Sequence, residues 1–196
     1  SYVAGRPGAR YAITVRNNSG ERLLAVMSVD GVNVVTGQTA AWLQSGYVFD
    51  PYQGHEISGW RKSDREIAAF EFTSLGDSYA ARTGRPQNVG VIGVAAFRER
   101  RREPIAYQPA PMIGAMEKSA ADSSAGASRA ESNAPSAMAQ QIGTGHGQRR
   151  YDPVAQTNFE RESTRANQRI AVYYDSFEAL VARGIIRDRG HGRQPD

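Results

Sequence analysis

The sequence predicts a mainly β protein, an antiparallel β-sandwich with a C-terminal strand and a short helix packed on it. Three observations support this fold class. Short segments alternate apolar and polar residues, turn residues separate these segments at short intervals, and the first hundred residues show no helical period. Many short strands at such spacing are typical of a sandwich or a barrel.

The hairpin at Asp30-Gly31 is the strongest local signal. The pair lies between two apolar runs that are rich in Val. A type I′ turn needs φ > 0 at both central residues, and Asp and Gly tolerate this conformation. We therefore expect a two-residue turn, with Gly31 at positive φ, that joins residues 22–29 to residues 32–35.

Other strands follow from the same alternation. Residues 10–16 have one apolar and one polar face, as expected of a strand with one side in water. Residues 89–97 are apolar on both faces, which is typical of a central, covered strand. Gly93 within this run indicates close approach by a neighbour, or a bulge. The remaining predicted strands are residues 46–49, 55–60, 66–73 and 169–174.

A short helix is predicted after the last strand. Asp175 as N-cap and Glu178 three residues later form a capping box, and Gly184 stands where a left-handed residue ends a helix. One strand and one short helix cannot bury enough apolar surface alone. We therefore expect both to dock on the sandwich.

Composition divides the chain into three segments. Residues 1–103 are predicted to form the sandwich, and residues 151–196 the C-terminal segment that docks on it. Residues 104–150 are rich in Ala and Ser and are predicted to be a linker or excursion. Within them, the GTGHG motif at 143–147 is expected to be a turn that re-enters the fold.

Composition also excludes several classes of function. The chain has no cysteine, which excludes disulfides, thiol nucleophiles and Cys-ligated zinc. Its 24 basic and 20 acidic residues give a net charge of +4 and are spread evenly along the chain, which disfavours nucleic-acid binding. No apolar run reaches the roughly 18–20 residues of a transmembrane segment. The chain begins at Ser1, so we expect that a targeting peptide has been removed.

Four basic residues form a candidate anion-binding cluster: Arg82, Arg85, His146 and Arg149. The first two lie in the long connection 74–88, where guanidinium groups and loop amides could hold an anion. His146 and Arg149 would join them if the GTGHG segment meets this connection. Alternatively, the two arginines pair with nearby carboxylates or carbonyls and brace the loop.

A second candidate is a surface platform made of Trp60, Arg61 and Tyr79. An aromatic ring beside cations could stack on a sugar or a base. The alternative is a buried structural tryptophan followed by solvated charges.

No metal site, cofactor site or catalytic motif is expected. His55-Glu56 resembles the start of a zinc-protease motif, but Gly59 replaces the second histidine. The three histidines lack the spacing of metal ligands. GTGHG lacks the Walker lysine and the glycine spacing of dinucleotide folds, and no G-x-S-x-G elbow occurs.

Several longer segments resemble a family of conserved hypothetical proteobacterial proteins, many of which carry an exported-type leader. The segments are SVDGVN, SGYVFDP, GWRKS and SYAARTGRPQNVGVIGVAAF, with GTGHG and IAVYYDS matching more loosely. The resemblance implies a β-rich fold and a periplasmic or secreted location. It implies no activity and no catalytic residues.

Two function hypotheses remain open. The first is a non-enzymatic binding or structural module of the bacterial cell envelope, with a protein or glycan partner. The second is an enzyme or small-ligand-binding protein that acts on an anionic ligand through the Arg/His cluster. A concave surface that brings Arg82, Arg85 and His146 together would favour the second.

Overall fold

The computed structural model describes residues 1–85, 88–101 and 141–187 of this chain. These residues form eleven strands, one 3₁₀ helix and two short α-helices, so the predicted mainly β class is confirmed. All described residues except Arg101 belong to one compact unit. No helix within the described ranges has the length and apolar character needed to span a membrane.

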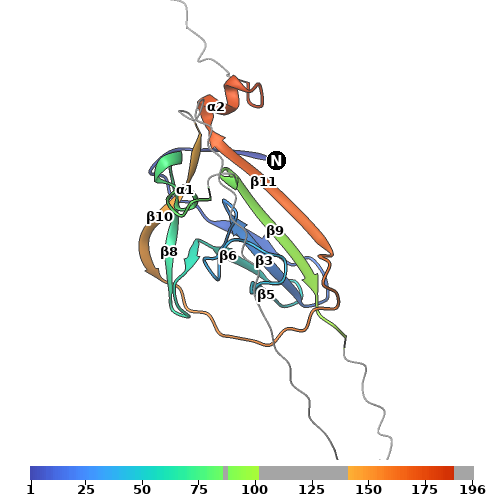
Figure 1. Ribbon diagram of the computed structural model, residues 1–196. Helices are drawn as coiled ribbons and strands as arrows, with labels where there is room; N and C mark the ends of the chain where they lie inside the picture. Colours follow the sequence, from blue (N-terminus) through green and yellow to red (C-terminus); the bar gives the residue numbers. More distant parts are fainter. Residues whose placement is uncertain (86–87, 102–140, 188–196) are drawn as a thin grey trace, which may run out of the picture. The chain divides into compact units, whose positions relative to one another are not determined.

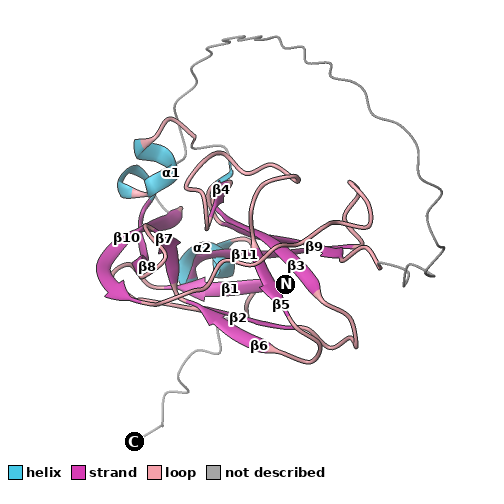
Figure 2. Ribbon diagram, turned by 90° about the horizontal axis from the view of Figure 1, so that it is seen from below, coloured by secondary structure: helices cyan, strands magenta, loops and turns pink. Residues whose placement is uncertain are grey.

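The strands form three sheets (Figures 1 and 2). The largest sheet has the strand order β1 (Tyr2–Gly5), β11 (Gln168–Ser176), β9 (Val91–Arg98), β3 (Leu23–Val29) and β4 (Val32–Asn33). Its sixth strand, β5 (Tyr47–Phe49), also pairs with β3. A three-stranded sheet contains β10 (Ile142–Tyr151), β8 (Glu66–Ser74) and β7 (Gly59–Arg61), and a two-stranded sheet pairs β2 (Ile13–Arg16) with β6 (Gly54–Ile57). The β1–β11 pair is parallel, so the six-stranded sheet is mixed rather than purely antiparallel.

The predicted hairpin is present. Val29 pairs with Val32, and the two residues between them have φ of 53° (Asp30) and 72° (Gly31). Positive φ at both positions confirms the primed turn. A Cβ atom on Gly31 would lie 2.8 Å from the Cβ of Asn88, so this turn also requires glycine for space.

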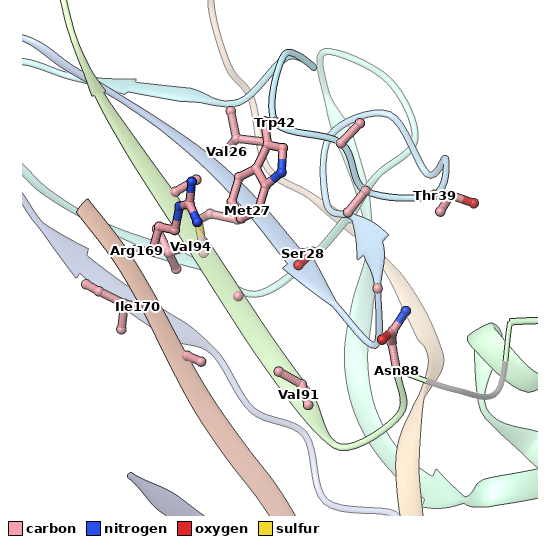
Figure 3. Close-up of a pocket in the computed structure, with 16 residues that line it drawn as sticks. Val26, Met27, Ser28, Thr39, Trp42, Asn88, Val91, Val94, Arg169 and Ile170 are labelled. Atoms are coloured by element: carbon pink, nitrogen blue, oxygen red, sulfur yellow. The ribbon is translucent and has the colours of Figure 1, made fainter. Parts of the chain in front are cut away.

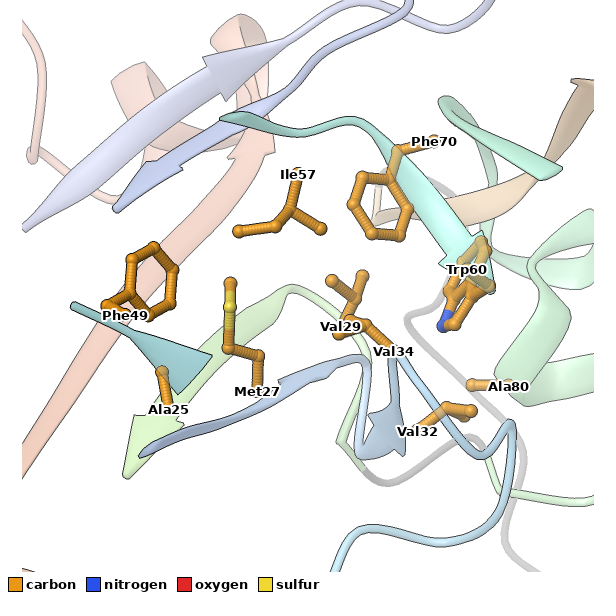
Figure 4. Close-up of a cluster of buried hydrophobic side chains, with 10 residues drawn as sticks. All are labelled: Ala25, Met27, Val29, Val32, Val34, Phe49, Ile57, Trp60, Phe70 and Ala80. Carbon is orange, nitrogen blue, oxygen red and sulfur yellow. The ribbon is translucent and has the colours of Figure 1, made fainter. Parts of the chain in front are cut away.

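The buried core lies between the six-stranded sheet and the two smaller sheets (Figure 4). It comprises Ala25, Met27, Val29, Val32, Val34, Phe49, Ile57, Trp60, Phe70 and Ala80. Fully burying one aliphatic or aromatic side chain contributes about 1.5–3 kcal/mol. This cluster joins six strands and a helix, so it holds the three sheets together.

The C-terminal part of the chain completes both larger sheets. β11 lies between β1 and β9, and β10 pairs with β8 along its length, with an irregularity between His146 and Arg149. Figure 1 shows the segment after β10 passing from the three-stranded sheet to the start of β11. Residues 168–176 therefore dock by strand pairing, and helix α2 (Phe177–Ala182) follows directly.

The structure corrects the expected turn at GTGHG. These residues lie inside β10, so the linker predicted over 104–150 is wrong at its C-terminal end, and residues 104–140 lie outside the described ranges. The physical reason is pairing with β8, together with close packing against Ser78 and Val89. A Cβ on Gly143 would lie 2.5 Å from the Cβ of Ser78 and 2.8 Å from a methyl of Val89.

Two boundaries also differ from the prediction. The strand predicted over 55–60 is divided into β6 and β7, which belong to different sheets. Helix α2 is capped by Ser176, whose Oγ accepts a hydrogen bond from the Ala179 amide, and not by Asp175. Its end follows the prediction, because Gly184 has φ of 69° and closes the helix.

A connecting segment, residues 152–167, crosses part of the outer face of the six-stranded sheet. Its backbone bonds to the end of β9, where the Glu162 amide donates to the Arg98 carbonyl over 2.9 Å. Phe159 and Ala166 from this segment pack on the side chains of β3 and β9. The outer face of the sheet is therefore covered at this end.

Candidate functional site

The structure brings two of the four predicted anion-binding residues together. His146 on β10 packs its ring on Tyr79 of helix α1 (Tyr79–Arg82), with ring centroids 4.1 Å apart. Lys62 Nζ lies 3.3 Å from His146 Nε2, and Arg82 is close enough to affect the histidine electrostatically. We call Lys62, Tyr79, Arg82 and His146 the basic–aromatic cluster.

The electrostatics of this cluster disfavour further positive charge. Burial against neighbouring groups lowers the pKa of His146 to about 4, and the charges of Lys62 and Arg82 act in the same direction. Burial also lowers the pKa of Lys62, with a smaller contribution from Arg149. The ring of His146 is therefore neutral near pH 7, and Nε2 accepts from the ammonium group of Lys62.

The other two predicted residues have partners of their own. Arg85 donates to the Thr39 hydroxyl over 3.2 Å, so it links the connection 74–88 to another loop and its partner is neither a carboxylate nor a carbonyl. Arg149 forms an ion pair with Glu66 at 3.1 Å, although it is near enough to Lys62 to lower the lysine's pKa. The four residues thus do not surround one anion site.

The predicted surface platform is wrong for two of its three residues. The Trp60 side chain belongs to the core and is only 1% exposed. Arg61 is held by the Tyr47 hydroxyl at 3.2 Å and by Asp152 at 3.3 Å. Tyr79 instead contributes to the basic–aromatic cluster. The alternative of a structural tryptophan describes Trp60 correctly.

A groove on the outer face of the six-stranded sheet was not predicted (Figure 3). Strand register places Ser28, Gly93 and Ala171 side by side on neighbouring strands β3, β9 and β11. All three side chains are small, so the sheet is hollow along this row. A Cβ on Gly93 would lie 2.9 Å from the Ser28 Oγ, which agrees with the close approach predicted there.

The next row of side chains and a loop frame this groove. Register places Val26 beside Ala95 and Ala95 beside Arg169. The loop 39–42 forms the opposite wall, and its Trp42 ring lies 4.5 Å from the Arg169 guanidinium carbon. The cavity has a volume of about 420 Å³. We call this feature the sheet groove.

A second pocket of about 560 Å³ lies beneath the start of the connecting segment, between β5 and residues 153–157. Its charged groups already have partners. Arg61 pairs with Asp152, and Asp64 accepts from Gln156 over 3.1 Å. This pocket therefore offers less unused binding capacity than the sheet groove.

A buried polar network joins the hairpin turn to the C-terminal strands. The Asp30 carboxylate accepts from the Tyr174 hydroxyl at 2.5 Å, the Thr144 amide at 2.8 Å and the Gly90 amide at 2.9 Å. The Thr144 hydroxyl in turn contacts the hydroxyls of Tyr174 and Tyr11. Burial raises the pKa of Asp30, against the opposing effect of these hydrogen bonds. The network lines neither pocket, so its role is to fix β10 and β11 to the turn.

No cluster of three or more His, Asp or Glu side chains suited to a metal ion occurs within residues 1–85, 88–101 and 141–187. Comparison with protein-family models, curated proteins and solved structures found no match. The resemblance to exported proteobacterial proteins therefore stays a prediction. The sequence did contain one signal for the groove, since Gly93 lies within an otherwise apolar strand.

Proposed function

We propose that the protein is a non-enzymatic binding module of the bacterial cell envelope and that the sheet groove is its ligand site. The groove itself carries the proposal. Ligand sites are typically concave and apolar, with a few polar groups that orient the ligand. Here an apolar floor lies beside Trp42, whose side chain is 53% exposed despite its size.

The groove lining supports binding rather than catalysis. Among the described residues that line it, Arg169 carries the only charge, and none is a carboxylate, a histidine or a lysine. General acid–base catalysis needs a group that exchanges a proton near neutral pH, which arginine does not do. A ligand held in this groove meets no group with that capacity.

The envelope location rests on the resemblance to proteins with an exported-type leader. A protein or glycan partner in the envelope belongs to the same proposal. Fractionation of cells that produce the natural gene product, with periplasmic and cytoplasmic marker enzymes, tests it. Recovery of the protein with the cytoplasmic marker alone would reject the envelope location without affecting the groove.

Binding in the groove is tested with Nile red, a neutral apolar dye that fluoresces in apolar sites. We expect the wild-type protein to bind the dye and Ala171→Phe to abolish binding, because the new ring fills the hollow row. Ala171 is exposed, so this change leaves the core intact. Val3→Phe is the matched control, since Val3 is exposed on the same sheet outside the groove. Equal binding by all three proteins would reject the groove as the site.

A second candidate function is binding of an anionic ligand at the basic–aromatic cluster. The observation that favours it is mutual repulsion among Lys62, Arg82 and any charge on His146, which a bound anion would relieve. Addition of inorganic phosphate should then raise the pKa of His146 from about 4, as measured by NMR titration of its ring protons. If phosphate leaves the pKa of His146 unchanged both in wild-type protein and in Arg82→Gln, this function is excluded.

A further inference from the structure

We propose that the ligand of the sheet groove is a single-chain apolar carboxylate whose head group pairs with Arg169. This inference rests on the proposed binding function and adds the chemical class of the ligand. It follows from the charge of Arg169, which lies at the edge of the sheet groove among uncharged lining residues.

The charge of Arg169 has no acidic partner within the described part of the chain. Its guanidinium lies over the Trp42 ring at 4.5 Å, and no hydrogen bond or ion pair to it is present among the described residues. Stacking on an aromatic face orients a guanidinium while leaving its N–H edges open. Those edges match the two oxygens of a carboxylate.

One cation favours a singly charged head group. A phosphate monoester carries about −1.5 to −2 charge at pH 7, more than one arginine can balance. A carboxylate carries one charge and accepts two parallel hydrogen bonds from a guanidinium. Charge complementarity therefore selects a monocarboxylate.

The rest of the groove suits one extended apolar chain. The cavity of about 420 Å³ is at the lower end of the ~300–1,000 Å³ range of small-molecule sites. Strands advance about 3.3 Å per residue, so the floor from Ala95 to Val91 is roughly 13 Å long. Figure 3 shows Arg169 and Trp42 near one end of the floor and Asn88 near the other. This arrangement accommodates a single acyl chain rather than the two chains of a phospholipid.

The test compares decanoate with decanol, which has the same chain and a neutral head group. Binding is measured by calorimetry and by tryptophan fluorescence on the full chain, with wild type, Arg169→Gln and Arg16→Gln. Arg169 is exposed, so its substitution leaves the core intact. Arg16 is an exposed arginine on β2, outside the groove, and controls for general electrostatic attraction.

We expect Arg169→Gln to weaken decanoate binding about tenfold or more, the effect of losing a hydrogen bond between charged groups. Decanol binding should not change, and Arg16→Gln should behave as wild type. The carboxylate assignment would be overturned if wild type binds decanoate and decanol with equal affinity. It would also be overturned if Arg169→Gln and Arg16→Gln lose the same affinity for decanoate. If Nile red still binds the wild type in that case, the groove remains a ligand site for a neutral molecule.

Two further outcomes would also overturn the inference. If wild-type protein binds neither decanoate nor Nile red, the proposed function fails together with it. If raising the protein concentration produces a dimer that excludes Nile red, as measured by sedimentation, the groove is instead an interface between two copies of the chain.

Discussion

Substitution of Gly31 by alanine tests both the hairpin and its contact with the groove wall. Gly31 has φ of 72°, and placing an L-residue in this left-handed region costs roughly 1–2 kcal/mol. The new Cβ would also lie 2.8 Å from the Cβ of Asn88, and overpacking of this kind costs about 1–3 kcal/mol. The two effects sum to about 2–5 kcal/mol, a large part of the ~5–15 kcal/mol stability of a typical domain.

Gly184→Ala supplies the matched control. Gly184 has φ of 69°, and nothing lies within 4 Å of the Cβ that would be added. This variant measures backbone strain without a steric contact, so it should lose only about 1–2 kcal/mol. The difference between the two variants isolates the contact of Gly31 with Asn88.

The assay is urea unfolding monitored by circular dichroism, with the slope checked for each variant. Asn88→Gly in the Gly31→Ala background removes the Cβ of residue 88, so it should recover the contact term and leave the strain term. Equal losses in Gly31→Ala and Gly184→Ala would refute the Asn88 contact. No loss in Gly31→Ala would refute the positive φ.

Three other predictions concern buried or shielded polar groups. Asp30→Asn replaces the buried carboxyl group, whose pKa is raised, with an amide that does not titrate. Wild type should therefore lose stability, relative to the variant, as pH rises from below 3.8 through the pKa of Asp30 in the folded protein. If the urea midpoints of the two proteins change with pH in the same way, this prediction is wrong. Thr144→Val removes the hydroxyl between the buried Tyr174 and the partly buried Tyr11, and it should lower the free energy of unfolding by about 1–3 kcal/mol in the same assay. Lys62→Met should raise the pKa of His146 above about 4 in an NMR titration, whereas an unchanged value would mean that burial and Arg82 lower it without Lys62.

Local signals in the sequence predicted much of the fold. The Asp30-Gly31 turn, the strand 89–97 and the end of the last helix at Gly184 each depend on residues close together in the chain. The division of residues 55–60 into two strands was missed because it depends on which sheet each half joins. Similarly, β1 was not predicted, since its four residues are ordered by pairing with β11.

The candidate sites were harder to predict because they are assembled across strands. The sheet groove exists because small residues from β3, β9 and β11 fall in register, and sequence alone gives no register between distant strands. The same limit affected the Arg/His cluster. His146 reaches Tyr79 only because β10 pairs with β8, whereas Arg85 turns to Thr39.

The placement of β11 has a consequence for how the chain is made. Tyr2 pairs with Tyr173, and β9 pairs with β11, so the six-stranded sheet is complete only after residue 176 has left the ribosome. At about 5–20 residues per second, roughly 4–15 s separate the synthesis of β9 from that of β11. During this interval the apolar edge of β9 has no partner from β11, and unpaired edges are templates for aggregation. A nascent chain of this protein should therefore depend on chaperone holding until its last strand emerges.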